Sequence, residues 1–307
     1  MGYIRPVARR LPDGTIGAVL PFHVSFEGLE KDIICRDDED CDTLVKCLVV
    51  CSKRKDVIII IYAVVSNHAH VAVLARNIYE AKAYAREVKR MYSQLFSRKY
   101  GSSKVLHRTD VDVQLLDNDW YLRNALAYIP RNAYDNGAES VADYKWTGFR
   151  AFFRQGKQSG HRRPVARMTR REWRQVLHTG DYLGDVSWVV NERDELEPES
   201  FCDKEYLEQA FNRDETFFYK SVGTVNVSEM TQRLVVTPRK MKTDAEFLKE
   251  VEAISLRWFM TGVADLPVSK KARLIPYVYH TMKTTVPQMA RGFGLSREEI
   301  TRLLNVK

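Results

Sequence analysis

Two consecutive stretches of this sequence predict neighbouring strands, and they constrain the fold more than any other feature. Residues 57–65 form the longest apolar run and are rich in β-branched side chains, which is typical of a buried strand. Ser66-Asn67 is a turn signal, and His68–Ala75 then alternates as a second strand. The run is far shorter than the ~20 apolar residues of a membrane helix, so we expect no membrane span.

The elements around these two strands predict the architecture of a first domain. Further strands are expected at residues 18–26 and 110–116, and helices at 40–53, 78–100 and 118–132. The order is therefore β-α-β-β-α-β-α. It predicts an α+β fold, a ferredoxin-like antiparallel sheet with helices on one side.

The length of the chain, 307 residues, allows one large domain or two ordinary ones. We expect the first domain at residues 1–153. Residues 154–238 begin with a strongly basic stretch and show no clear periodicity, so we interpret them as a basic connecting region. A solvated charged face is the alternative for the basic stretch, whose members include Arg154, Lys157, His161 and Arg163.

Residues 239–307 predict a helical region that ends in a DNA-binding helix-turn-helix. Gly294 is expected to make the turn, and Ser296 is expected to cap the second helix. A helical hairpin with a purely structural role is the alternative.

The formal net charge of +8 favours nucleic acid or another anionic surface as a partner. The five cysteines are scattered without a C-x-x-C pair, which favours reduced thiols over a structural zinc site. The early arginines are not followed by an apolar stretch with a cleavage site, so a signal peptide is not expected. We therefore expect a cytoplasmic protein that associates with the nucleoid through DNA.

Two histidines lie at the start of the second strand. Because side chains alternate between the faces of a strand, His68 and His70 leave the same face, next to Ala72. Two neutral imidazoles a few ångströms apart can bind one divalent metal ion. A pair of surface histidines without a ligand is the alternative, since an H-x-H pattern by itself is weak.

The predicted helix at residues 118–132 carries a tyrosine and an asparagine one turn apart. Tyr128 and Asn132 therefore share one helical face. The amide oxygen can complete a metal shell while the phenolate attacks, and a nearby cation helps to form that phenolate because a phenol has a pKa near ~10. A packing role for Tyr128 is the alternative. Pro130 is expected to bend the helix or to begin a new helical segment.

Over residues 21–149 these pieces together resemble the single-tyrosine HUH transposases, in particular the REP-associated tyrosine transposases. The segments that carry the resemblance are Phe22-His23-Val24-Ser25 as the opening strand, residues 36–40 as the charged entry to the first helix, residues 62–71 as the histidine motif, residues 121–132 as the tyrosine helix, and residues 144–147 as the aromatic segment that follows. The chain departs from the family pattern at Ala133, where the family has proline, at Pro130, where a polar residue is common, and at residues 102–108, an imperfect match to a glycine-containing loop.

The resemblance implies a role for each matching residue. Tyr128 would be the nucleophile that forms a 5′-phosphotyrosine link to DNA, and His68, His70 and Asn132 would bind a magnesium or manganese ion. The family also implies DNA hairpins with a nearby single-stranded cleavage site as substrates, and a homodimer as the assembly.

Two sets of residues are candidates for DNA contacts. The set on the helix at residues 78–100 comprises Lys82, Arg86, Lys89, Arg90, Arg98 and Lys99, and the set on the last helix comprises Arg297, Thr301 and Arg302. Basic side chains neutralise phosphates, and Tyr84, Tyr92 and Phe96 among the first set are candidates for stacking on unpaired bases. A core-facing aromatic stripe beneath a solvated basic face is the alternative for the first set. The last helix would enter a DNA groove.

We therefore expect a transposase, a metal-dependent single-stranded DNA endonuclease and strand transferase that cleaves near DNA hairpins. A non-catalytic DNA-binding regulator on the same fold is the first alternative. A related replication-initiator or relaxase nuclease is the second, and one candidate tyrosine in place of a pair, together with the short chain, argues against it.

Overall fold

The structure is a computed structural model that describes residues 2–27, 33–101, 106, 111–135, 137–153, 162–224, 242–282 and 284–305. Two hydrophobic cores are present, one formed within residues 11–222 and the other within residues 247–300. Arg154, Lys157 and His161 of the predicted basic stretch, most of the loop at 102–108, and residues 225–241 lie outside the described residues.

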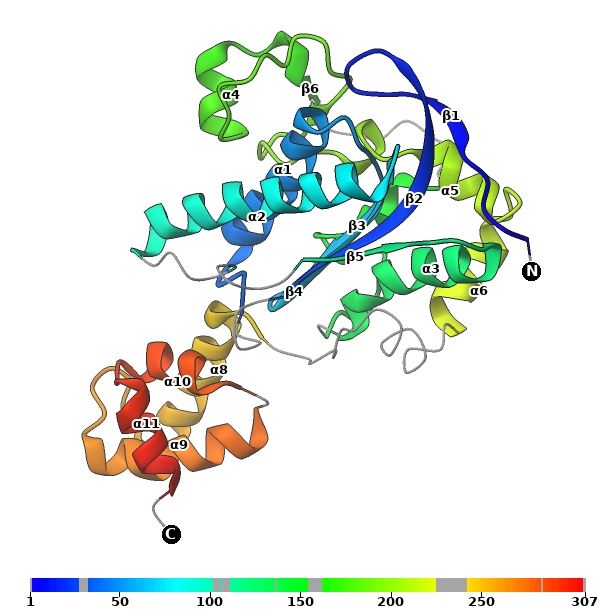
Figure 1. Cartoon of the computed structure of the whole chain (residues 1–307). Helices are drawn as coiled ribbons and strands as arrows, with labels where there is room; N and C mark the ends of the chain where they lie inside the picture. Colours follow the sequence, from blue (N-terminus) through cyan, green and yellow to red (C-terminus); the bar gives the residue numbers. More distant parts are fainter. Residues whose placement is uncertain are drawn as a thin grey trace.

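An antiparallel sheet forms the centre of the first unit. β2 (Ile16–Glu27) pairs on one side with β4 (His68–Ala75) and on the other with β5 (Asp112–Leu115), and β4 also pairs with β3 (Ile58–Val64). β1 (Val7–Arg10) forms a hairpin with the first residues of β2, where the sheet curls (Figure 1). The central order is thus β5-β2-β4-β3, and each of the four predicted strands is present.

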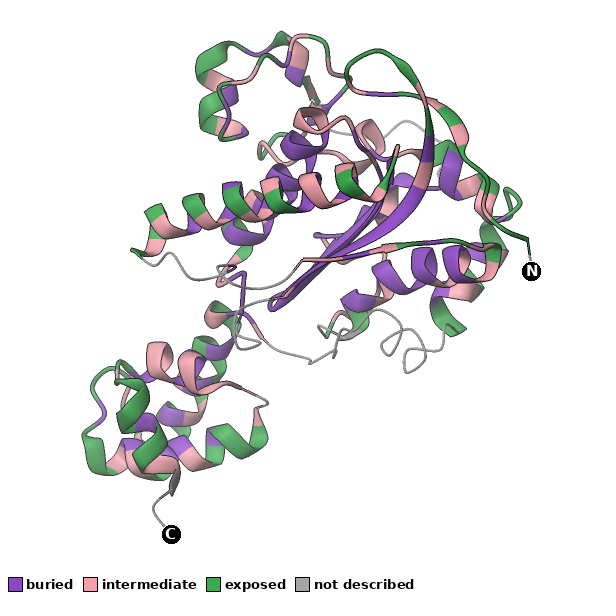
Figure 2. Cartoon of the chain, viewed as in Figure 1, coloured by how far each residue is buried: buried purple, intermediate pink, exposed green. Residues whose placement is uncertain are grey.

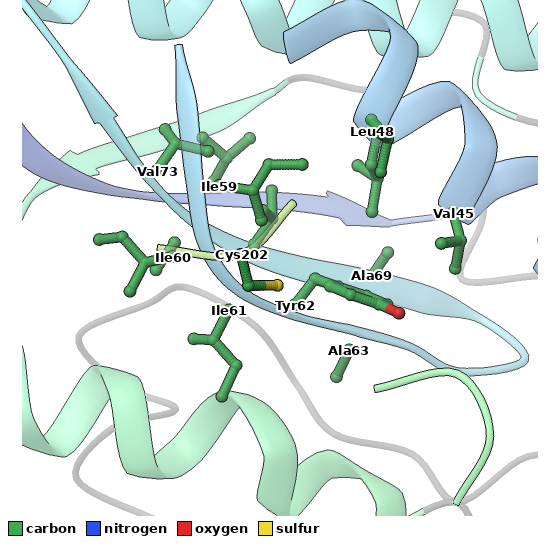
Figure 3. Close-up of a cluster of buried hydrophobic side chains, with 14 of the residues drawn as sticks. Val45, Leu48, Ile59, Ile60, Ile61, Tyr62, Ala63, Ala69, Val73 and Cys202 are labelled. Atoms are coloured by element: carbon green, nitrogen blue, oxygen red, sulfur yellow. The ribbon is translucent and has the colours of Figure 1, made fainter. Parts of the chain in front are cut away.

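Helices cover both faces of this sheet. α1 (Asp38–Arg54) and α2 (Ile78–Tyr100) pack together on one face, whereas α3 (Asp119–Asp135) packs on the other (Figure 1). In the core close-up, Leu48 of α1 lies over one side of the strands and Ile61 points to the other side, toward α3 (Figure 3). All eight residues of β4 are buried because its alternate side chains meet helices on opposite sides. The prediction of helices on one side only is therefore wrong for α3.

Local signals set the ends of these helices. The side chain of Asn77 accepts two backbone N–H groups at the start of α2, and Gly101, with φ of 65°, ends it in the left-handed conformation. At the start of α3 the side chain of Asn118 accepts the N–H of Tyr121 at 2.9 Å. α3 continues through Pro130 as one helix instead of beginning anew there.

Most of the predicted connecting region is folded onto the first unit. Its elements, with the short helix before them, are η2 (Gly148–Ala151), β6 (Arg163–Pro164), η3 (Val165–Arg167), α4 (Arg170–Val176), β7 (Val189–Val190), η4 (Pro198–Ser200), α5 (Lys204–Ala210) and α6 (Glu215–Thr224). Trp173, Phe211 and Phe218 are buried in the same core as the sheet. Of its basic residues, Arg163 pairs with Glu172 at 2.6 Å, while Arg171 is exposed to solvent. This stretch therefore contributes to the core in addition to connecting the two units.

The second unit is helical and has its own core. It consists of α8 (Asp244–Phe259), α9 (Val268–Thr281), α10 (Val286–Phe293) and α11 (Arg297–Asn305). Gly294, with φ of 64°, makes the turn between α10 and α11, and Ser296 accepts the N–H of Glu299 at 3.1 Å, both as predicted. The unit touches the first one at Asp244, whose carboxylate lies 3.7 Å from the guanidinium of Arg36.

In the described part of the chain, every helix is too short or too polar to cross a bilayer. All five cysteines are buried free thiols. The structure therefore offers no disulfide framework.

Candidate active site: a histidine, asparagine and tyrosine cluster

The two predicted histidines and the tyrosine helix meet on one face of the sheet. Alternation along β4 directs His68 and His70 toward α3, on which Tyr128 and Asn132 lie one turn apart. The Nε2 atom of His68 lies 3.0 Å from the Oδ1 atom of Asn132. The rings of His70 and Tyr128 meet edge to face, with 5.4 Å between their centroids. The structure thus brings together all four residues that were predicted for metal binding and cleavage.

His68 lies between two amide oxygens. Its Nδ1 atom is 2.8 Å from the Oδ1 atom of Asn67, and its Nε2 atom faces Asn132. The amide of Asn132 is fixed in this orientation, because its Nδ2 group donates to the carbonyls of Tyr128 and Ile129 at 3.0 and 3.1 Å. Burial lowers the pKa of His68, so its imidazole is neutral and carries a single N–H near pH 7.

One imidazole proton cannot serve both oxygens. When the Nδ1–H of His68 donates to Asn67, the lone pair of Nε2 points at the oxygen of Asn132, and two acceptors face each other. A cation between them satisfies both. Without a cation, the pair is satisfied if the amide of Asn67 rotates and Nε2–H donates to Asn132.

The donor set fits a divalent ion. Two neighbouring ligands of an octahedral ion, each about 2.1 Å from it, lie about 3.0 Å apart. His68 Nε2 and Asn132 Oδ1 have this separation, 3.0 Å, and the ring of His70 lies 4.9 Å from that of His68. Within the described ranges no three histidine, cysteine, aspartate or glutamate side chains could hold a metal ion by themselves, so an ion at this cluster would take the amide oxygen of Asn132 as a third ligand. Imidazole nitrogens favour manganese over magnesium.

A third histidine, His23 on β2, belongs to the same cluster and was not predicted as a site residue. β2 pairs with β4 in a register that sets His23 opposite Ala72 and Ser25 opposite His70, which places His23 on the α3 side of the sheet. Its Nε2 atom lies 3.0 Å from the Nδ1 atom of His70. The alternation of polar His23 and Ser25 with apolar neighbours is a signal for this face, but the sequence does not give the partner strand or its register.

His23 is placed to select the tautomer of His70. Burial lowers the pKa of His23 to about 3, and burial together with the neighbouring imidazoles holds the pKa of His70 well below its ordinary range, so both are neutral. In the described residues, the Nδ1 atom of His23 and the Nε2 atom of His70 have no hydrogen-bond partner. If His70 binds a metal through Nε2, its proton lies on Nδ1 and is donated to His23.

The cluster is closed to solvent. Tyr128, Asn132 and His70 have no exposed surface, and His68 is 2% exposed. α6 packs along α3, where Arg131 donates to the carbonyls of the α6 C-terminal residues. A cavity of about 460 Å³ does open at the start of α3, but its lining residues are Gly2, Asp119, Trp120, Arg123, Asn124, Phe217 and Ser221. In the described conformation Tyr128 is therefore out of reach of any ligand in the solvent.

The aromatic residues of α2 do not form a surface for bases. Tyr84, Tyr92 and Phe96 are buried in the core, and the hydroxyl of Tyr84 donates to the carbonyl of Leu48 on α1. Their predicted stacking on unpaired bases is therefore wrong, and the alternative of a core-facing aromatic stripe is correct. α2 also lies on the face of the sheet opposite α3 (Figure 1), so its basic residues do not line the cluster.

The predicted basic contacts differ in their freedom to bind phosphate. Lys99 forms ion pairs with three carboxylates at 2.8 to 3.0 Å, and Arg90 pairs with Glu87 at 2.6 Å. Arg86 and Arg98 are exposed and form no ion pair with another described residue. Lys82 and Lys89 are half-buried. On the second unit Arg297, Thr301 and Arg302 are exposed along α11.

Comparisons with known proteins found a distant likeness among solved structures. No family model and no curated protein matches this chain. A solved structure of a REP-associated tyrosine transposase bound to a REP hairpin aligns with 49% of this chain and 81% of its own, at 13% sequence identity and a TM-score of 0.36. At that level of similarity, function has to be argued from the site itself.

Proposed function

We propose that this chain is a metal-dependent single-stranded DNA endonuclease and strand transferase of the transposase type, which cleaves near DNA hairpins through Tyr128. One observation carries the proposal: His68, His70 and Asn132 converge beside Tyr128, with the Nε2 atom of His68 3.0 Å from the Oδ1 atom of Asn132 and the ring of His70 against that of Tyr128. An imidazole nitrogen and an amide oxygen at this separation can both bind one divalent cation.

The residues of the chain have distinct tasks in this proposal. His68, His70 and Asn132 would hold a manganese or magnesium ion, which supplies positive charge to polarise the scissile phosphate and to favour the phenolate. The oxygen of Tyr128 attacks phosphorus, the bond from phosphorus to the 3′ oxygen breaks, and that oxygen leaves as a hydroxyl after gaining the proton that the phenol gives up. The 5′-phosphate stays on Tyr128 until the 3′-hydroxyl of another strand reverses the reaction.

Two features of the fold support this function. The order β5-β2-β4-β3, with helices after β2 and β4, supports a ferredoxin-like sheet, which is the fold that the proposal requires. The short helices α10 and α11, joined at Gly294, support a helix-turn-helix, in which the exposed Arg297, Thr301 and Arg302 of α11 would contact a DNA groove. Hairpin DNA is the inferred partner, and a homodimer is the inferred assembly; a monomer on DNA by light scattering excludes the latter.

A DNA-binding regulator without nuclease activity is the second candidate, and the closure of the cluster favours it. Tyr128 has no exposed surface, so the described conformation cannot accept a phosphodiester. The two candidates differ in whether the protein ever forms a covalent link to DNA.

The test is formation of that link. Hairpin oligonucleotides with single-stranded flanks, labelled at either end, are incubated with the protein and Mn²⁺ or with EDTA, and adducts are resolved on denaturing gels. We expect a metal-dependent adduct that carries the label 3′ of the cut and is lost in Tyr128→Phe. Tyr134→Phe, an exposed tyrosine on the same helix, is the matched control and should retain the adduct. Tight hairpin binding without any adduct establishes the regulator instead.

A further inference from the structure

The far end of the second unit exposes a group of aromatic rings. Trp258, at the end of α8, is 41% exposed, and Tyr277 of α9 is 38% exposed. Their ring centroids lie 4.6 Å apart, and the ring of Phe259, which is half-buried against the core of the second unit, lies 6.0 Å from that of Trp258. Large aromatic side chains are usually buried in a core, so the two exposed rings of Trp258 and Tyr277, in contact with each other, indicate a binding surface.

Two cations border these rings. The Nζ atom of Lys270 lies 5.5 Å from the centroid of the Phe259 ring, and the guanidinium of Arg273 lies 6.0 Å from it. Lys270, Arg273 and Tyr277 follow one another at i, i+3 and i+7, so they share one face of α9. Neither cation forms an ion pair with any residue that the structure describes, and the sequence of α9 contains no aspartate or glutamate.

This surface is separate from the other candidate DNA contacts. α8 touches the first unit through Asp244 at its beginning, whereas Trp258 and Phe259 lie at its opposite end. α9 lies at the end of the second unit away from the sheet, and much of it is exposed (Figures 1 and 2). α11 packs against α9, but its exposed residues Arg297, Thr301 and Arg302 are not among the residues of this surface.

We propose that Trp258, Phe259, Tyr277, Lys270 and Arg273 form a binding surface for single-stranded nucleic acid. Exposed rings accept unpaired bases by stacking, and the neighbouring cations, which have no carboxylate partner among the described residues, neutralise the phosphates between those bases. A protein partner also favours aromatic residues, but a helix whose charged residues are all cationic fits a polyanion better. A duplex fits poorly because its base faces are covered. The surface does not depend on cleavage at Tyr128, and it gives the chain a second contact with an unpaired strand.

Binding of labelled oligo(dT) of about 20 nucleotides to the full chain in EDTA, followed by fluorescence anisotropy, tests the stacking component. The double variant Trp258→Ala/Tyr277→Ala is expected to weaken binding at least about tenfold, and Trp258→Phe, which keeps a ring, to retain it within about threefold. Tyr182→Ala removes an exposed aromatic of the first unit and should leave the affinity unchanged. Oligo(rU) distinguishes an RNA from a DNA ligand, and duplex DNA should show no such dependence on the rings.

The phosphate component has its own readout. Lys270→Gln/Arg273→Gln should lower the slope of log affinity against log salt by about 1.4, since each single-strand phosphate contact contributes about 0.7. Unchanged oligo(dT) affinity and salt slope in both double variants, with wild-type melting curves, overturn the proposal. If the double variants bind DNA as the wild type does but no longer form a dimer in light scattering, the surface is a protein interface and the proposal is overturned. The adduct assay with Tyr128 is unaffected by either outcome, so the two proposals fail separately.

Discussion

Replacement of His23 by leucine tests whether the third histidine serves the metal site or only fills the core. His23 Nε2 is the hydrogen-bond partner of His70 Nδ1 at 3.0 Å, and leucine removes that acceptor. The Nδ1–H that His70 needs while it binds a metal is then buried without a partner, at a cost of about 1–3 kcal/mol. Loss of such an outer partner typically weakens metal binding about 10- to 100-fold, or about 1.4–2.7 kcal/mol, so the two estimates agree.

The replacement should have little effect on the stability of the metal-free protein. In the described residues the Nδ1 atom of His23 has no partner, and leucine removes this buried polar atom as well. His70 can also move its proton to Nε2 when no metal is bound. We therefore expect the free energy of unfolding in EDTA to change by less than about 1 kcal/mol.

Calorimetric titration of the full chain with Mn²⁺ measures the affinity, and urea unfolding in EDTA measures the stability. His23→Gln supplies an amide oxygen as acceptor and should keep most of the affinity. Wild-type Mn²⁺ affinity in a folded His23→Leu protein refutes the reasoning. Equal losses in the leucine and glutamine variants assign His23 to packing instead.

Three further outcomes follow from the same contacts. Each of the three buried histidines of the cluster binds a proton more weakly in the folded protein than in the unfolded chain. The stability that depends on their neutral form is therefore fully present above the unfolded pKa of ~6.5 and is lost as the pH falls below it, by up to about 1.4 kcal/mol per pH unit for each histidine. For His23 this loss of stability continues toward its folded pKa of about 3. Urea unfolding between pH 7 and pH 5 measures the loss, and a free energy of unfolding that does not change over this range contradicts burial of the neutral rings. Asn132→Ala removes a proposed metal ligand and should lower the Mn²⁺ affinity at least about tenfold, whereas Asn132→Asp supplies a carboxylate and should retain or raise that affinity. Equal Mn²⁺ affinities of the two variants would exclude Asn132 from the ligands. Leu48→Ala, at a fully buried position of α1, should cost about 2–5 kcal/mol in urea unfolding, and a smaller loss means that the core collapses into the space.

The sequence by itself determined the features that depend on neighbouring residues. The apolar run, its turn and the alternating strand after it placed β3 and β4, and the period of two set His68 and His70 on one face. Helical spacing set Tyr128 and Asn132 on one side of α3, and the residues at helix ends predicted caps such as Ser296. These relations are fixed by backbone geometry over a few residues, so no knowledge of distant contacts is needed.

Only the tertiary structure decided which distant segments meet. The register between β2 and β4 brought His23 to His70, and nothing within β2 reveals that pairing. Packing of α3 on the second face closed the cluster, and packing of α1 on α2 buried Tyr84, which the sequence left open as a base-stacking residue. In each case the outcome depends on which apolar surfaces cover one another, and burial is shared by elements far apart in the chain.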